Sequence, residues 1–96
     1  MRIEILGEAQ QDLTDGFRFY ENQRAGLGDY FLDSLYADID SLRLYAGIHP
    51  RHSGQHRLLS KRFPFAVYYE VAGNVARVNA ILDCRRDPAW IQERLK

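Results

Sequence analysis

Residues 56–95 read HRLLSKRFPFAVYYEVAGNVARVNAILDCRRDPAWIQERL and hold the strongest structural pattern of this chain. Residues 65–71 and 75–82 are two apolar runs rich in β-branched and aromatic residues, which is typical of β-strands. The intervening Ala72-Gly73-Asn74 is typical of a tight turn, so the two runs predict an antiparallel hairpin. In its second strand we expect one face with Ala76, Val78, Ala80 and Leu82 and another with Val75, Arg77, Asn79 and Ile81.

Further elements flank this hairpin on both sides. Residues 56–61 predict one more strand, which Pro64 separates from the hairpin because proline cannot donate to a ladder of hydrogen bonds. Downstream, Asp87 followed by Pro88 predicts a short helix that runs to Leu95, with the aspartate as its N-cap.

The first 46 residues predict one strand and two amphipathic helices. Residues 2–6 alternate as a short strand, and from Glu8 the apolar period becomes helical. Gly16 lies inside the first helix, where its small size permits close packing. Two glycines within residues 24–29 mark a break before the second helix, and residues 47–55 have no period and predict a loop. The apolar stripes are Ala9, Leu13, Phe17 and Tyr20, and then Leu27, Phe31, Leu35, Ile39 and Leu42, with Tyr45 or Ala46 as an extension.

The order of these elements is strand, helix, helix, three strands and short helix. This order predicts an α+β fold in which an N-terminal strand precedes an antiparallel helical hairpin that packs on a small, mainly antiparallel sheet. With 96 residues and no linker, the chain predicts a single domain over residues 1–96.

The composition places the chain among globular proteins, with 46% hydrophobic and 27% charged residues. Cys84 is the only cysteine, so no internal disulfide can form, which fits a reducing compartment. The N-terminal residues do not resemble a signal peptide, and no apolar run approaches the ~20 residues that span a bilayer. We therefore expect a soluble, cytoplasmic protein with no membrane partner.

The net charge of zero hides an asymmetry between the two halves of the sequence. Residues 1–46 hold four basic and nine acidic side chains, a formal charge of −5, and residues 47–96 carry +5. One interpretation is a polarised molecule with a side that binds anions. The other is that the two halves neutralise each other across the fold.

The sequence lacks the motifs that mark several classes of functional site. There is no paired-cysteine, zinc-protease or glycine-rich phosphate motif, so we expect neither a metal nor a cofactor. Cys84 has no base beside it to activate the thiol. His49, His52 and His56 lie within one loop region, where one of them is a candidate acid or base and solvated loop polarity is the alternative.

Arginine and lysine side chains are the main functional signal, since the guanidinium group binds phosphates and carboxylates through paired donors. In an antiparallel hairpin the end of the second strand lies beside the start of the first. We therefore expect Lys61 and Arg62 to meet Arg85 and Arg86 at one rim of the sheet, with chance clustering as the alternative. For Trp90 two roles remain open, which are stacking on a nucleic-acid base and packing in the core. The candidate contact residues are Arg57, Lys61, Arg62, Arg77, Arg85, Arg86 and Trp90.

The strings KRFPFAVYYEV and LDCRRDPAWIQERL, together with AQQDLTDGFRFYENQRAGLGDYF, resemble the RelE/ParE toxin superfamily of bacterial type II toxin–antitoxin systems. The resemblance covers nearly the whole chain. It implies a small toxin with the RelE/ParE fold, which a cognate antitoxin protein neutralises by wrapping around it. The acidic segment of such an antitoxin would fit the basic rim.

The resemblance implies one of two cellular targets. ParE-like members poison DNA gyrase, whereas RelE-like members cleave mRNA on the ribosome, and in the second case Lys61, Arg62 and Arg85 would be the catalytic cations. Ala66, however, stands where those nucleases carry a catalytic arginine, and Asp83 stands where many carry a histidine. Their C-terminal tyrosine is absent, with Trp90 and Ile91 in that region. These departures favour a gyrase inhibitor, with the ribosome-dependent endoribonuclease and a harmless, degenerate toxin as alternatives.

Overall fold

The computed structural model describes residues 1–96 and contains four helices and one five-stranded sheet. The order of the strands in the sheet is β1-β5-β4-β3-β2, in which β1 pairs parallel with β5 and all other pairs are antiparallel. The elements are β1 (Arg2–Ile5), α1 (Gly7–Gln23), α2 (Leu27–Asp40), α3 (Leu42–Tyr45), β2 (Arg51–His52), β3 (Gln55–Leu59), β4 (Phe65–Ala72), β5 (Val75–Asp83) and α4 (Pro88–Arg94).

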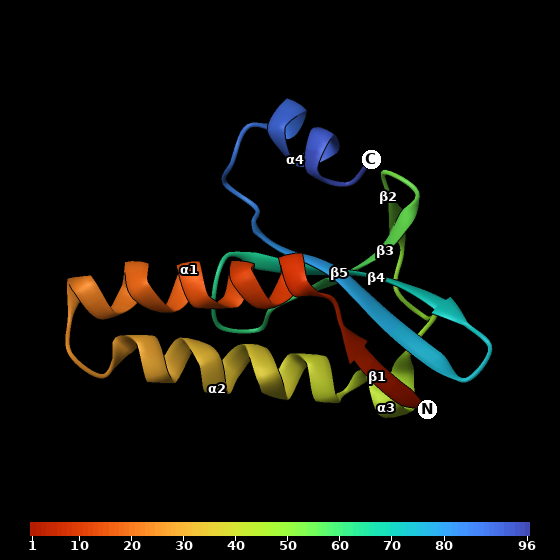
Figure 1. Cartoon of the computed structure of the whole chain (residues 1–96), viewed down its shortest axis with the longest axis horizontal. Coiled ribbons are helices and arrows are strands. Elements are labelled where there is room, and N and C mark those ends of the chain that lie inside the picture. Colours follow the sequence, from red (N-terminus) through yellow and green to blue (C-terminus); the bar gives the residue numbers. More distant parts are fainter.

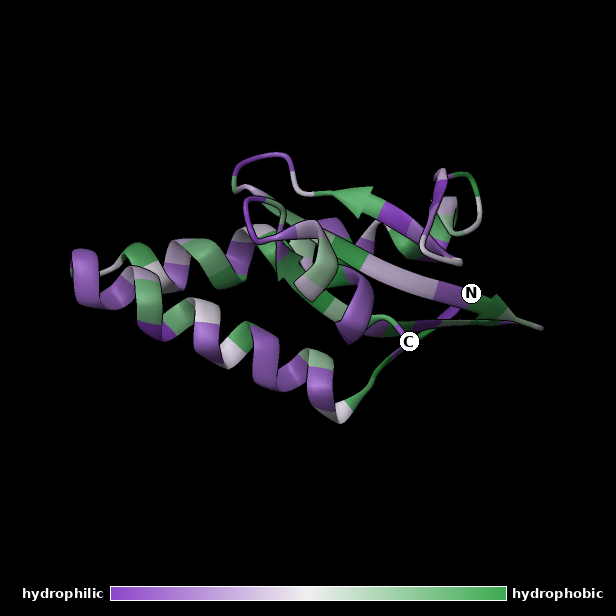
Figure 2. Cartoon of the chain, turned by 90° about the horizontal axis from the view of Figure 1, so that it is seen from above, coloured by the Kyte–Doolittle hydropathy of each residue, from purple (hydrophilic) through white to green (hydrophobic).

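Helices α1 and α2 form the predicted antiparallel hairpin and lie side by side (Figure 1). Gly26, with φ of +89°, is the N-cap residue of α2, and the carboxylate of Glu21 accepts hydrogen bonds from the N–H groups of Gly26 and Gly28. The expected role of Gly16 is confirmed, because a Cβ atom there would lie 2.5 Å from Cζ of Phe31. Hydrophobic and hydrophilic residues alternate along both helices (Figure 2), as amphipathic helices require.

The two helices cover one face of the sheet and bury most of the predicted stripes there. Phe17 differs from the expectation: it is only half-buried, on the outer side of the hairpin, where it contacts Gly28. The second helix also ends earlier than expected, since Ser41 separates α2 from α3. The main core cluster joins the helices to β4 and β5 through Ala9, Leu13, Tyr20, Phe31, Leu35, Ile39, Leu42, Phe65, Val67, Tyr69, Ala76, Val78 and Ile81.

Helix α4 lies against the opposite face of the sheet from the hairpin (Figure 1). Its N-terminus is as predicted: Asp87 is the N-cap, and its side chain accepts a hydrogen bond of 2.9 Å from the N–H of Ala89. Leu95 is buried against this face, and Trp90 and Ile91 pack beside it. Helix α4 therefore closes a second, smaller core.

The expected faces of β5 are wrong in their second half because the strand contains a β-bulge. Tyr68 pairs with Ala80, whereas the next residue, Tyr69, pairs with Val78, so Asn79 is an extra residue. Before the bulge, Ala76 and Val78 face the helical hairpin. After it Ile81 faces the hairpin, while Ala80 and Leu82 face α4.

The predicted loop at residues 47–55 and the predicted strand at residues 56–61 also need correction. Arg51–His52 forms β2 and pairs with β3, which begins at Gln55 and ends at Leu59. A two-residue strand is too short to produce a period in the sequence. No helix in the structure is long and apolar enough to cross a membrane.

Candidate functional site

The loops that carry the candidate cations lie side by side at one rim of the sheet. Phe65 pairs with Asp83 at the end of the β4–β5 ladder, and the N–H of Cys84 donates to the carbonyl of Pro64 at 2.7 Å. Loop 60–64 therefore adjoins loop 84–87, as the hairpin topology predicted. We refer to the four cations of these loops, Lys61, Arg62, Arg85 and Arg86, as the basic rim.

An aromatic anchor fixes the position of loop 60–64. Phe63 packs among Tyr20, Phe31 and Tyr30, with ring centroids 4.8 to 5.4 Å apart. Aromatic pairs at such spacings contribute more than their buried area alone. The loop backbone is consequently held against the helices while the side chains of Lys61 and Arg62 remain exposed.

Within the basic rim, Arg85 is bound to a carboxylate of its own chain. Its Nε and Nη2 atoms donate to Asp83 at 3.0 and 2.7 Å, and its backbone N–H donates to the same carboxylate at 2.8 Å. The hydrogen bonds from Arg85 hold the pKa of Asp83 below its usual value, and those to Asp83 raise the pKa of Arg85. Arg85 thus has reduced capacity to bind a second anion.

Arg86 has no carboxylate partner and lies on an aromatic ring instead. Its guanidinium carbon is 3.7 Å from the centroid of Trp90, and that of Arg94 is 5.6 Å from the same centroid. Two cations therefore lie near the indole, and Trp90 also packs on the core beneath α4. The indole that the sequence left open therefore packs on the core of its own chain and has Arg86 on its ring.

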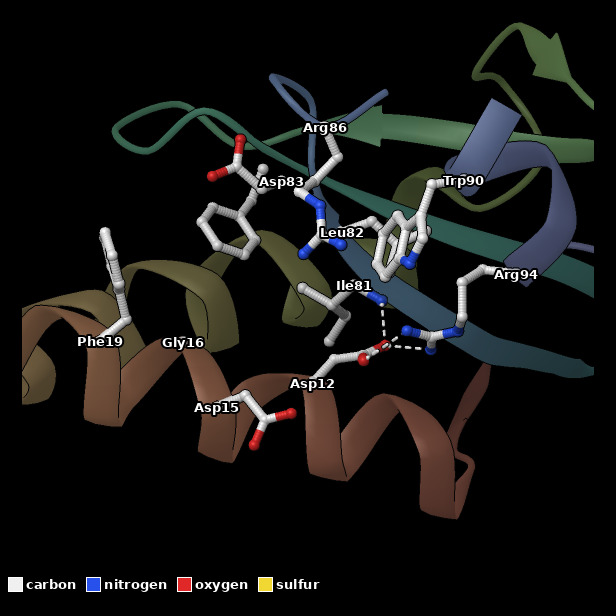
Figure 3. A pocket seen from close by; sticks show the side chains of 11 residues that line it. Asp12, Asp15, Gly16, Phe19, Ile81, Leu82, Asp83, Arg86, Trp90 and Arg94 are labelled. Carbon is white, nitrogen blue, oxygen red and sulfur yellow. Dashed lines mark hydrogen bonds and ion pairs between the residues drawn. The ribbon is translucent and has the colours of Figure 1, made fainter. Parts of the chain in front are cut away.

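A cleft of about 330 Å³ adjoins Arg86 and separates α1 from α4 (Figure 3). Asp12 lies on the α1 side and accepts two hydrogen bonds from Arg94, at 3.0 and 2.8 Å, and one from the N–H of Ile81 at 3.0 Å. The hydrogen bond to Asp12 is the main cause of the raised pKa of Arg94. Phe19, which is 53% exposed, and Asp15 complete the α1 side of the cleft.

The remaining candidate cations lie in different surroundings. Arg62 is 5.8 Å from the ring centroid of Tyr30 and, like Lys61, forms no ion pair. Arg57 is half-exposed on β3, opposite Tyr68. Burial raises the pKa of Tyr68, and a hydrogen bond with Arg57 opposes this rise.

Arg77 lies away from the basic rim, near the start of β5. It donates to Glu4 of β1 at 3.1 Å, and the two residues are register partners in the parallel pair. Together with the bonds of Arg94 to Asp12 and Glu8, this pair joins the acidic and basic halves of the sequence. Part of the charge asymmetry is therefore neutralised inside the fold, whereas Lys61, Arg62 and Arg86 of the basic rim keep no carboxylate partner.

Ala66 is fully buried beneath α4, with Ala80, Leu82 and Leu95 around it. The face of the sheet at this point is apolar, and Cys84 nearby does not have an activated thiol. Burial raises the pKa of Cys84, with Arg57 acting in the opposite direction.

Two of the three histidines form a cluster with a buried tyrosine that sequence reasoning did not find. Tyr69 is fully buried, and its hydroxyl bonds to Nδ1 of His49 and accepts from the N–H of Gly47 at 2.9 Å. His56 stacks on the same ring at 5.1 Å. His52 stays exposed, and no cluster of three or more His, Cys, Asp or Glu side chains could hold a metal ion.

Asp12, Phe19 and Arg94 line the cleft and were also missed. Asp12 and Arg94 are 82 positions apart in the sequence. Taken alone, each looks like an ordinary charged residue on the polar side of its helix. The exposed Phe19, which falls outside the apolar stripe of its helix, was the one signal in the sequence that could have indicated a cleft there.

The sequence matches no family model and no curated protein. The structure is similar to a chain of a solved structure described as "Chromosomal ParDE TA system from P. aeruginosa", with a TM-score of 0.72 and 19% sequence identity. The match covers 84% of this chain and 92% of that chain. The predicted α+β architecture is thereby confirmed, and the chain has the fold of the RelE/ParE type that its sequence resembles.

Proposed function

We propose that this chain is the toxin of a ParDE-type toxin–antitoxin system, that a cognate antitoxin neutralises it in the cytoplasm, and that it inhibits DNA gyrase. The observation that carries the proposal is the similarity of fold over 84% of the chain to a component of a ParDE system. The resemblance in sequence at the rim loops and the helical hairpin supports it independently.

The basic rim supports an acidic protein partner. Lys61, Arg62 and Arg86 are exposed and have no carboxylate partner within the chain. Charged side chains in this state attract an oppositely charged partner and increase its rate of association. An acidic segment of the antitoxin would neutralise these three cations.

The surroundings of Ala66 favour gyrase over mRNA as the target. RNA cleavage through the 2′-OH needs an acid, a base and cations around the scissile phosphate. Here Ala66 is covered by α4, and Arg85 is engaged by Asp83. An alanine covered by α4 and an arginine already paired with a carboxylate agree better with contact surfaces than with a nuclease centre.

The first test is expression of the chain with and without the protein encoded beside it. We expect growth arrest without that protein and rescue with it. Purified chain should inhibit supercoiling by gyrase and stabilise gyrase–DNA cleavage complexes. Unchanged supercoiling at saturating chain, together with cuts in the A-site codon of translated mRNA, would instead identify a ribosome-dependent nuclease.

A matched pair of variants separates a specific contact from a general loss of charge. Arg86→Glu reverses an unpaired cation of the basic rim, whereas Arg43→Glu makes the same charge change on α3, where Arg43 is paired with Asp40. We expect the first variant to weaken neutralisation and the second to leave it intact. Normal growth at high levels of the wild-type chain would contradict a toxic function altogether.

A further inference from the structure

The cleft between α1 and α4 contains an arginine whose side-chain donors are unused. Arg86 lines this cleft, and Figure 3 shows its guanidinium group pointing toward Ile81. The guanidinium lies over the ring of Trp90, and neither an ion pair nor a hydrogen bond within the chain engages it. Because a guanidinium carries its N–H donors in its own plane, a contact through its face leaves those donors free for a planar anion.

Two of the three carboxylates in the lining are paired with cations of the chain. Asp12 accepts both of its side-chain hydrogen bonds from Arg94, and Asp83 accepts from Arg85 at 3.0 and 2.7 Å. The same contact engages Arg94, which is the other arginine of the cleft. Arg86 is therefore the cation of the cleft that is left for a ligand, and it favours a negatively charged one.

The rest of the lining is largely apolar and favours a ligand with a flat hydrocarbon body. Phe65, Ile81 and Leu82 are buried side chains that line the cleft from the sheet. Gly16 adds no side chain on the α1 side, and the neighbouring Phe19 leaves 53% of its surface exposed. A volume of about 330 Å³ lies at the lower end of the range for small-molecule sites, which limits the ligand to a small one.

We propose that this cleft binds a small aromatic carboxylate. The carboxylate accepts a pair of hydrogen bonds from the guanidinium group of Arg86. The ring lies on the apolar side chains from the sheet and covers the exposed ring of Phe19. Such a ligand joins α1 to the loop before α4, and its binding does not require the proposed function.

The charges of the lining argue against other classes of ligand. Asp15 has no cationic partner, because the neutral side chain of Gln11 donates to it at 2.9 Å. A phosphate with two negative charges would be repelled by Asp15 more strongly than a carboxylate with one. A cationic ligand would be repelled by Arg86, and a neutral aromatic ligand would leave the donors of Arg86 without an acceptor.

The test compares phenylacetate with two probes of similar shape, the neutral phenylacetamide and the more highly charged phenyl phosphate. Each probe is titrated into the full chain, and NMR follows the backbone amides and the indole N–H of Trp90. We expect phenylacetate to shift the signals of Phe19, Ile81 and Trp90, and to bind about tenfold more tightly than phenylacetamide. Equal binding of these two probes, tighter binding of phenyl phosphate, or shifts confined to other elements would overturn the assignment.

Substitutions at exposed positions test the charge and the apolar contact separately. Arg86→Gln should weaken the binding of phenylacetate about tenfold and leave that of phenylacetamide unchanged. Arg18→Gln is the matched control, since Arg18 is an exposed arginine without an ion pair that lies beside Phe19 in the sequence and outside the lining. Phe19→Ser should weaken both probes to a similar degree, because it removes apolar surface only. Wild-type affinity of Arg86→Gln for phenylacetate would contradict the proposed site.

Growth assays separate this site from the proposed function, because the probe titrations need neither a partner protein nor a cellular target. If the chain arrests growth but phenylacetate does not bind in the cleft, the ligand site fails and the toxin assignment stands. If phenylacetate binds through Arg86 while expression of the chain is harmless, the toxin assignment fails and the ligand site stands.

Discussion

Asp12 and Arg94 join the first helix to the last through two parallel hydrogen bonds of 3.0 and 2.8 Å. The side chain of Asp12 is only 9% exposed, and its carboxylate also accepts from the N–H of Ile81. One residue thus connects α1, β5 and α4. This arrangement fixes the width of the cleft beside Trp90.

Replacing Asp12 with alanine should therefore reduce the stability of the whole domain. The change leaves Arg94 and the Ile81 N–H without their partner, and we expect the free energy of unfolding to fall by about 2–3 kcal/mol. Urea unfolding followed by the fluorescence of Trp90, the only tryptophan, measures this change. Glu8→Ala is the control: Glu8 lies 3.9 Å from Arg94 and is 80% exposed, so its loss should cost under ~0.5 kcal/mol. Equal effects of the two changes would contradict this account.

Because α1 and α2 pack closely at Gly16, adding a single methyl group there should lower the free energy of unfolding. A Cβ atom there would lie 2.5 Å from the Phe31 ring, which is itself fully buried, so Gly16→Ala should destabilise the chain by about 1–3 kcal/mol. Thermal unfolding checks the value. Gly7→Ala is the matched control, since nothing lies within 4 Å of its added Cβ atom. This variant should have neutral or slightly increased stability. Combining Gly16→Ala with Phe31→Leu should recover part of the lost stability, because the smaller side chain leaves room for the added methyl group.

The sequence predicted those parts of the fold that depend on local pattern. The β4–β5 hairpin, the two helices and the Asp87 cap all follow from periodicity, turn residues or a capping residue within a few positions. The bulge at Asn79 was not predictable in this way, because its side chain bonds to Gln55, which is distant in the sequence. Strand β2 was missed for a similar reason, because its two residues form a strand only through their pairing with β3.

The candidate site was predictable in its location but not in its chemistry. Strand topology alone brings loop 60–64 beside loop 84–87. The division of the arginines into paired and unpaired members depends on contacts that are specific to the folded chain. Arg77 is engaged by Glu4 and Arg94 by Asp12, whereas Arg86 lies on Trp90 without a carboxylate. From the sequence, both Arg77 and Arg86 are candidate contact residues, and only Arg86 is expected at the basic rim.

The cluster of His49, His56 and Tyr69 predicts a stability that depends on pH. Burial, with a contribution from the charge of His56, lowers the pKa of His49, and its Nδ1 atom is engaged by the Tyr69 hydroxyl. The folded state therefore favours the neutral ring. Stability should be complete above the unfolded-state pKa of about 6.5 and should decline as the pH falls through and below it.

Urea midpoints across this range of pH measure the effect. His49→Gln should flatten the decline, whereas His52→Gln, at an exposed position in β2, should leave it unchanged. A decline that persists in the His49 variant would assign the pH dependence to other groups.

The division of the arginines predicts which of them matter for recognition. Arg86→Ala removes a cation that no carboxylate of the chain engages, and a charge-assisted contact of this kind contributes about 1.5–3 kcal/mol to binding. We therefore expect a tenfold or greater loss of affinity for the neutralising partner. Arg77→Ala removes a cation that Glu4 already engages, so it should leave that affinity within about twofold while lowering stability by under ~1 kcal/mol. Calorimetric titration of both variants against the same partner gives the two affinities. If Arg77→Ala were the more damaging change, the partner would have to bind near the start of β5 rather than at the basic rim.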